Sequence, residues 1–239
     1  MGVVDQKWAS FMTNRLGTIQ SWTGDEIRDR IKLMFGQVYK SLRWPATRTI
    51  AVQMILEYGC PGQNVVDWPK VEIDKCEVAA IYWGYKLNSR YTGDVYGIDT
   101  YQTLERSAAL GMRPSPILAS VVPAFRGQMG AWMKQDAHAL FGALPANTKF
   151  IADCDDSDIN LCALLASVGF RVGAKTYSSD GRTFGHVVAC CEIPRYAAGP
   201  KYIVPLDATE YEAYPGWEPG PENRRAEKIF WYAESPGGG

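Results

Sequence analysis

The sequence has no excess of charge of one sign, because 25 basic and 26 acidic residues leave a formal net charge of −1. Proteins that bind the nucleic-acid backbone usually carry an excess of Lys and Arg, which neutralise phosphates. We therefore expect no nucleic acid as the main partner. Long apolar runs are also missing, since none reaches the roughly 18 residues that a helix needs to cross a bilayer. We expect no membrane span.

The N-terminal residues lack the features of a targeting segment. Residues 1–14 contain no basic stretch followed by an apolar one, which argues against a secretory signal peptide. A chain without such a signal is made in the cytoplasm, where thiols stay reduced. We therefore expect free thiols at all six cysteines, which are Cys60, Cys76, Cys154, Cys162, Cys190 and Cys191.

Histidine is scarce, because the chain contains only His138 and His186. Imidazole is the side chain that most often transfers protons in catalysis, so few residues compete for that role here. No Cys-x-x-Cys pair is present to suggest a zinc site, and we expect neither a metal nor a cofactor. We interpret His138 as structural.

The first hundred residues have the pattern of amphipathic helices. Thr23 and Glu26 have the spacing of a capping box, and a second helix is predicted over residues 49–58. A third helix is predicted to begin with a cap at Asp74. After the capping box, apolar residues recur at helical spacing: Ile27, Ile31, Met34, Phe35, Val38 and Leu42. We interpret residues 1–70 as a helical N-terminal extension.

The pattern changes along the rest of the chain. Residues 107–148 carry scattered Gly and Pro, which favour an insert with one short helix near residues 129–141. A helix is then predicted over residues 155–168, closed by Gly169. Strand-like runs follow at residues 171–177, 186–192 and 202–206. This order predicts an α+β fold, with one domain over residues 71–232 that contains the insert, and a flexible tail at 233–239.

Cys154 lies where the predicted helix begins, in the run Asp-Cys-Asp-Asp-Ser-Asp. A thiol at a helix N-terminus faces unpaired backbone N–H groups and the positive end of the helix dipole, which favour the thiolate. The same N–H groups can donate to an oxyanion in acyl transfer. The neighbouring aspartates act in the opposite direction and raise the pKa of the thiol, so a nearby imidazolium would be needed to offset them.

His186 and Asp207 are the candidates to complete a catalytic group with this thiol. If their strands pair as an antiparallel hairpin whose turn is centred between Tyr196 and Ala197, the two residues lie directly opposite each other. Directly opposite Cβ atoms are about 4.5–5.5 Å apart. The acid would then hold the imidazole in one tautomer, while the other ring nitrogen faces the thiol.

These residues carry a resemblance to a known family. The segments DCDDSDINLCALLASVGF, GHVVACCE and YIVPLDAT contain Cys154, His186 and Asp207, in this order. They resemble the bacterial and phage branch of the transglutaminase-like superfamily, which is related to papain. The upstream segment YWGYKLNSRYTGDVYGIDTYQTLERSA and the tail PGWEPGPENRR resemble members of the same branch.

The resemblance implies a papain-like core, in which the helix that carries the cysteine packs on an antiparallel sheet that carries the histidine and the aspartate. It implies a cysteine peptidase, amidase or acyl-transferase that acts on peptide or protein amides. By position, Cys154, His186 and Asp207 match the catalytic triad, and Gln102 matches a polar residue that supplies a second oxyanion donor.

Two other interpretations remain open. The first is that the chain is a structural or assembly protein of a phage particle or tail, which uses the domain as a scaffold for partner subunits and is associated with the virion. In this role it could also cleave wall peptides. The second is a calcium site, because Asp153, Asp155 and Ser157 have an EF-hand-like spacing; however, Asp158 and Leu164 replace the Gly and Glu of that loop.

Overall fold

A computed structural model describes residues 24–58, 69–91, 101–111, 150–196 and 199–232. The helices are α2 (Gly24–Leu42), α3 (Ala46–Tyr58), α4 (Lys70–Leu87), α5 (Leu104–Gly111) and α8 (Cys154–Ser167), with a short 3-10 helix η4 (Pro221–Asn223). The strands are β1 (Ser89–Tyr91), β2 (Phe150–Ala152), β3 (Val172–Ser178), β4 (His186–Ile193), β5 (Tyr202–Leu206) and β6 (Ala226–Trp231). The predicted α+β class is confirmed.

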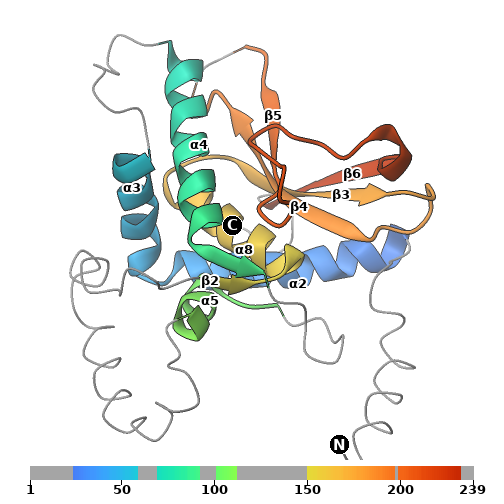
Figure 1. Cartoon of the computed structure of the whole chain (residues 1–239), viewed down its shortest axis with the longest axis horizontal. Coiled ribbons are helices and arrows are strands. Elements are labelled where there is room, and N and C mark those ends of the chain that lie inside the picture. The colour runs from blue at the N-terminus through green and yellow to red at the C-terminus, as the bar shows by residue number, and fades with distance from the viewer. Residues whose placement is uncertain (1–23, 59–68, 92–100, 112–149, 197–198, 233–239) are drawn as a thin grey trace, which may run out of the picture.

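The main sheet is antiparallel, with the strand order β5-β4-β3-β6. In Figure 1 α2 runs below this sheet, and α4 stands upright beside α3. A second, two-stranded sheet pairs β1 with β2 in parallel, so that the residues just before Cys154 lie beside the end of α4. The sequence had indicated β3, β4 and β5 but not β6. Because β6 is an edge strand with no fully buried residue, it lacks the apolar alternation that reveals a strand.

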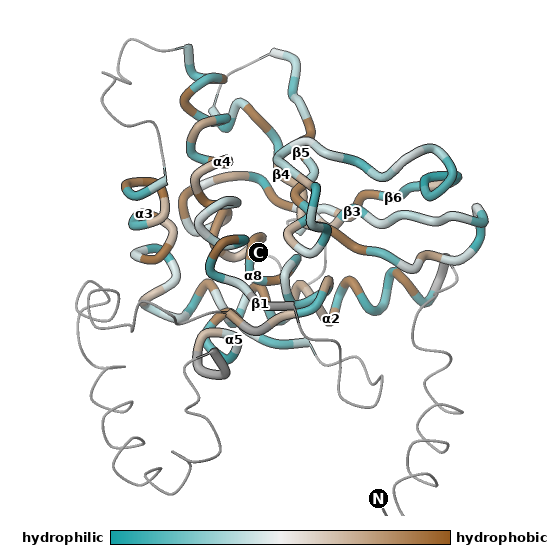
Figure 2. Tube along the Cα trace, viewed as in Figure 1, coloured by the Kyte–Doolittle hydropathy of each residue, from teal (hydrophilic) through white to brown (hydrophobic). Residues whose placement is uncertain are grey.

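A single hydrophobic core joins the helices to the main sheet. It contains Ile27 and Met34 of α2, Ile50 of α3, Leu161 of α8 and Ala189 of β4. Figure 2 shows hydrophilic and hydrophobic residues alternating along α2, as the predicted helical spacing requires. Helix α8 is polar only at its first turns and is almost entirely buried, because α2 packs on it from one side and β4 from the other.

Two predictions about the helical part are wrong. Helix α4 begins at Lys70, directly after Pro69, so Asp74 lies inside the helix, where it is buried, and does not cap it. Cys76 is disulfide-bonded, although Cys154, Cys162, Cys190 and Cys191 are free as predicted. A disulfide requires two thiols to meet in space, and the spacing of cysteines along the chain does not reveal such a meeting.

Other predictions concern the limits of these elements. The predicted helix at 155–168 corresponds to α8, and Gly169 follows it with a φ of 95°, as a C-capping glycine does. The cap at Thr23, the helix near 129–141, His138 and Cys60 lie outside the described residues. Residues 107–111 of the predicted insert belong to α5. Within the described ranges, no helix combines the length and the apolar character that crossing a membrane requires.

Candidate active site

Cys154 is the first residue of α8, and the preceding strand and cap hold it there. The Asp153 side chain accepts a hydrogen bond from the Asp156 N–H at 3.1 Å, which is the contact of a helix N-cap. The backbone N–H of Phe150 donates to the Asn88 carbonyl at 2.7 Å and extends the pairing of β1 with β2. Cys154 is half-buried and packs against the edge of the core.

The surroundings of Cys154 favour the neutral thiol. Burial raises the pKa of Cys154 well above its usual range, and the charges of Asp155 and Asp153 raise it further. The backbone N–H of Asp155 donates to the sulfur and acts in the opposite direction. Asp207 also contributes to the higher pKa, so its carboxylate lies close enough to act on the sulfur. Helix position alone therefore does not activate this cysteine.

Gln102 binds the first turn of α8. Its backbone N–H donates to Asp156 Oδ1 at 2.6 Å, and its side-chain amide Nε2 donates to Oδ2 at 2.7 Å. Asp156 is almost fully buried, so these two donors compensate for the loss of water around its carboxylate. The structure thus assigns Gln102 an anchoring contact, and its role as an oxyanion donor stays a prediction.

His186 and Asp207 lie in contact, with Nε2 of the ring 2.6 Å from Oδ2 of the carboxylate. The predicted register is nevertheless wrong by two residues, because Ala189 pairs with Leu206 and Ile193 with Tyr202. His186 and Asp207 are therefore diagonal and not direct neighbours across the strands. Diagonal residues on one face are within reach of long side chains, which is why the contact forms despite the shift.

Asp207 is held as a carboxylate by several donors. Its Oδ1 accepts hydrogen bonds from the backbone N–H of Thr209 at 2.9 Å, the Thr209 hydroxyl at 2.8 Å and the backbone N–H of Glu210 at 3.0 Å. Burial alone would raise the pKa of Asp207, but the hydrogen bond and charge of His186, together with these donors, lower it to about 2. A carboxylate fixed in this way orients the imidazole.

Helix α4 positions the loop that follows Asp207. The Tyr82 hydroxyl lies 2.7 Å from the backbone oxygens of both Asp207 and Ala213. Lys86 donates to the Ala213 carbonyl at 2.7 Å and to the Glu210 carbonyl at 2.7 Å. These contacts join residues more than a hundred positions apart, so the site depends on the docking of α4 against the end of β5.

A pocket of about 360 Å³ opens beside the His186–Asp207 pair. Its lining combines aromatic and polar side chains: Tyr177, Ser179, Gly185, His186, Asp207, Glu210, Trp217, Pro219 and Asn223. The rings of Tyr177 and His186 are stacked, with their centroids 6.4 Å apart. Cys154 does not line this pocket. Within the described residues, no hydrogen bond joins its sulfur to the His186 ring.

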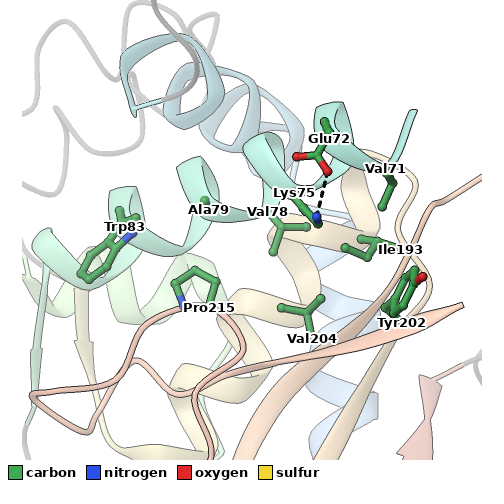
Figure 3. Close-up of a pocket in the computed structure, with 10 residues that line it drawn as sticks. All are labelled: Val71, Glu72, Lys75, Val78, Ala79, Trp83, Ile193, Tyr202, Val204 and Pro215. Atoms are coloured by element: carbon green, nitrogen blue, oxygen red, sulfur yellow. Dashed lines mark hydrogen bonds and ion pairs between the residues drawn. The ribbon is translucent and has the colours of Figure 1, made fainter. Parts of the chain in front are cut away.

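A larger groove of about 780 Å³ lies between α4 and the edge of the sheet. Figure 3 shows Trp83 and Val78 on one side, Tyr202 and Val204 on the other, and Pro215 near Trp83. The only charged residues that line it, Glu72 and Lys75, pair with each other at 2.8 Å. The groove therefore offers mainly apolar contact, and its two charged side chains are engaged with each other.

Three carboxylates at the start of α8 form the one group of the described residues that has the spacing of metal ligands. Asp153, Asp155 and Asp156 each offer one oxygen, and these atoms lie within 4.8 Å of one another. Asp153 and Asp156 already accept the hydrogen bonds of the cap and of Gln102. Helix capping by Asp153 and the contact of Asp156 with Gln102 thus account for two of the three acids without an ion.

Several residues of this site were missed in the sequence. Tyr177 was assigned to a strand, but only its pairing with His186 in the structure places it at the site. Tyr82 and Trp217 lie in the upstream segment and the tail that resemble the transglutaminase-like branch, but the sequence does not single out either one as a site residue. The alternation of β3 could have identified Tyr177 once the register was known, whereas the resemblance of their segments does not by itself place Tyr82 and Trp217 at the site.

Comparisons with known proteins reveal no relative, because no protein-family model, curated protein or solved structure matches the chain. The resemblance to the transglutaminase-like superfamily is therefore based on sequence motifs and stays a prediction. A function for this chain must be inferred from its own residues and their contacts.

Proposed function

We propose that the protein is a cysteine-dependent amide hydrolase or acyl-transferase of the transglutaminase-like kind, with Cys154 as nucleophile, His186 as base and Asp207 as orienting acid. The single observation that carries the proposal is the contact of 2.6 Å between His186 Nε2 and Asp207 Oδ2. A catalytic base needs a group that fixes its tautomer and orientation, and Asp207 is suited to this role because three further donors hold its other oxygen.

The contact determines which ring nitrogen of His186 takes part in the reaction. With Nε2 bonded to Asp207, Nδ1 remains as the acceptor for a proton. Since the pKa of Cys154 is raised, the sulfur is a thiol at rest and becomes a thiolate when its proton passes to Nδ1. Substrate binding has to bring these two groups within hydrogen-bond distance, as catalytic contacts often tighten only in the complex.

The reaction then follows the course of acyl transfer. The thiolate attacks the carbonyl carbon of an amide, and the negative charge moves to the carbonyl oxygen. The backbone N–H groups at the start of α8, including that of Asp155, are the donors for this oxyanion. His186 returns the proton to the leaving amine. Water, or another amine, then attacks the thioester and releases Cys154.

The arrangement of elements also supports a papain-like core. Cys154 begins a helix that packs against β4, His186 begins β4, and Asp207 follows β5, its antiparallel neighbour. Residues that are distant in the sequence thus gather around one end of the sheet. The scaffold role in a phage particle has no comparable contact in its favour.

The proposal is tested by the rate at which iodoacetamide alkylates Cys154, measured by peptide mass spectrometry between pH 5 and pH 10. We expect the rate at pH 7 to fall about tenfold or more in His186→Ala, because the thiol then has no base. Cys162 is buried in the same helix and serves as the internal reference. Equal rates in both proteins, no faster than for a cysteine in an unfolded peptide, would remove the basis for a catalytic thiol.

A further inference from the structure

The outer edge of β5 has backbone groups that no described residue binds. Strand β5 is the last strand of the main sheet, so only one of its two edges pairs with β4. Gly216 donates its N–H to the Pro205 carbonyl at 2.8 Å, so this carbonyl points away from β4. Residues two apart in a strand direct their backbone groups to the same edge. The N–H and the carbonyl of Ile203 therefore point outward, and among the described residues they have no backbone partner there.

This edge lacks the features that protect an edge strand from other chains. Edge strands usually carry charged side chains or a proline, which prevent pairing with a further strand. The strand at the opposite edge, β6, contains Glu227 and Lys228, both exposed. Strand β5 carries no charge, and 59% of Tyr202 and 43% of Ile203 are exposed. Its single proline, Pro205, is next to the last residue of the strand. The first half of β5 is thus open to pairing.

The groove between α4 and the sheet lies along this edge. Tyr202 and Val204 line the groove, whereas Ile203 between them does not, as the alternation of a strand requires. Trp83 and Val78 of α4 form the other side of the groove (Figure 3). A strand added beside β5 would alternate in the same way, so every second side chain would enter the groove.

The charges of the groove favour a neutral occupant. Glu72 and Lys75 are the only charged residues that line it, and they pair with each other at 2.8 Å. Neither is therefore left to balance a charge on a bound segment, and an unpaired charge in an apolar site is costly. We expect uncharged side chains at the positions of a partner strand that face α4.

A second copy of this chain does not fit the edge. Antiparallel pairing of two β5 strands about Ile203 would place Lys201 of one copy opposite Pro205 of the other. Gly216 is already bound to Pro205 on that side. A short segment of another protein that ends before Gly216 has no such conflict, and it meets both free groups of Ile203.

We infer that an extended segment of a partner protein adds to the main sheet beside β5 and inserts alternate apolar side chains into the groove along α4. In this mode of recognition, backbone hydrogen bonds supply affinity and the contacts of alternate side chains supply specificity. The N–H and the carbonyl of Ile203 form the central pair of hydrogen bonds. No residue of the proposed triad lines the groove, so the inference is independent of the function proposed above.

The probe is the peptide Thr-Val-Thr-Val-Thr-Val-Thr, labelled with fluorescein at its N-terminus and amidated at its C-terminus. Valine and threonine favour an extended backbone and carry no charge. Binding to the full chain is measured by fluorescence anisotropy. The same peptide with lysine in place of each valine should bind about fivefold more weakly, because the neutral groove has no acid for a lysine side chain.

Ile203→Pro tests the backbone contact. It removes the outward N–H and keeps the bonds between β5 and β4, because this N–H does not point towards β4. We expect the affinity for the valine peptide to fall about tenfold, since one hydrogen bond is lost. Ile203→Thr is the matched control. It changes the same side chain, which does not line the groove, but it keeps the N–H and should leave the affinity unchanged.

Trp83→Ala tests the other side of the groove and should weaken binding about fivefold or more, because aromatic side chains contribute strongly to interfaces. Leu87→Ala is its control, since Leu87 is exposed on the same helix but does not line the groove. The absence of saturable binding by wild type, unchanged binding in Ile203→Pro and Trp83→Ala, or an equal loss in Ile203→Thr overturns the inference. A wild-type dimer in analytical ultracentrifugation that Ile203→Pro abolishes also overturns it, because a second copy then occupies the edge.

Discussion

Arg195 and Asp74 are joined by two hydrogen bonds, one from the backbone N–H to Oδ2 at 2.6 Å and one from Nε to Oδ1 at 2.8 Å. Arg195 follows β4, whereas Asp74 lies in α4. The same guanidinium donates to the Val168 carbonyl at the end of α8 at 2.9 Å and pairs with Glu77 at 2.6 Å. One side chain thus ties α4, α8 and the β4–β5 connection together, far from the site but on the elements that carry it.

Arg195→Ala should strongly destabilise the fold. Only 6% of the Asp74 side chain is exposed, so the substitution leaves a buried carboxylate without its cation. Removal of one partner from a buried pair typically costs about 3–5 kcal/mol of unfolding free energy. We expect a loss of this size in Arg195→Ala, and urea titration is the measurement that checks it. Lys75→Ala on the same helix is the control, because its pair with Glu72 is exposed and should contribute less than about 1 kcal/mol. Similar losses for both variants would disagree with this account.

Two glycines in helices should respond in opposite ways to alanine. A Cβ at Gly84 of α4 would lie 2.7 Å from Met54 Cγ and 2.9 Å from Met54 Cβ, so Gly84→Ala forces α3 and α4 apart. We expect a loss of about 1–3 kcal/mol. At Gly36 of α2 no heavy atom lies within 4 Å of such a Cβ, and Gly36→Ala should add about 1 kcal/mol through helix propensity. Thermal unfolding of both variants measures the change in stability. A loss of stability in both Gly84→Ala and Gly36→Ala would show that the room for a Cβ atom does not decide the effect.

Stability should depend on pH through Asp207. Its folded-state pKa of about 2 lies below the ordinary value of 3.8 for an Asp side chain, so between these values the unfolded chain binds more protons than the folded one. The resulting stability is fully present above about pH 4 and is lost as the pH falls through 2. We expect wild type to exceed Asp207→Asn by about 2 kcal/mol at pH 5 and to match it near pH 1.5.

The measurement is chemical denaturation at a series of pH values. Asp29→Asn serves as the reference, because Asp29 is an exposed carboxylate whose side chain is 77% accessible. A difference between wild type and Asp207→Asn that stays constant from pH 5 to pH 1.5 would mean that the carboxylate charge is not what stabilises this region.

Gln102→Ala separates anchoring from catalysis. The loss of its amide removes one donor from the carboxylate of the buried Asp156, for which we expect a cost of about 1–3 kcal/mol. If Gln102 also donates to an oxyanion, kcat should fall about 10²-fold or more while KM changes little. Gln53→Ala on α3 controls for the loss of a glutamine. Normal kcat in a destabilised Gln102→Ala protein would leave Gln102 with the anchoring role alone.

The local elements of this protein could be predicted from the sequence because they depend on short-range patterns. Helical spacing from Ile27 onward marked α2, the acids before Ile159 marked the start of α8, and Gly169 marked its end. The same patterns located β4 and β5 and placed His186 and Asp207 at strand ends. The sequence indicated Cys154, His186 and Asp207 as candidate catalytic residues because of their side-chain chemistry and their positions at the ends of predicted elements.

Only the tertiary structure decided which of these residues meet. The connection from β4 to β5 shifts the register by two residues, so His186 and Asp207 are diagonal partners, which no local pattern specifies. Edge strand β6 and the buried ion pair of Asp74 depend on contacts with segments far along the chain. Periodicity reflects which side of an element is buried, whereas register and pairing reflect loop geometry and long-range packing.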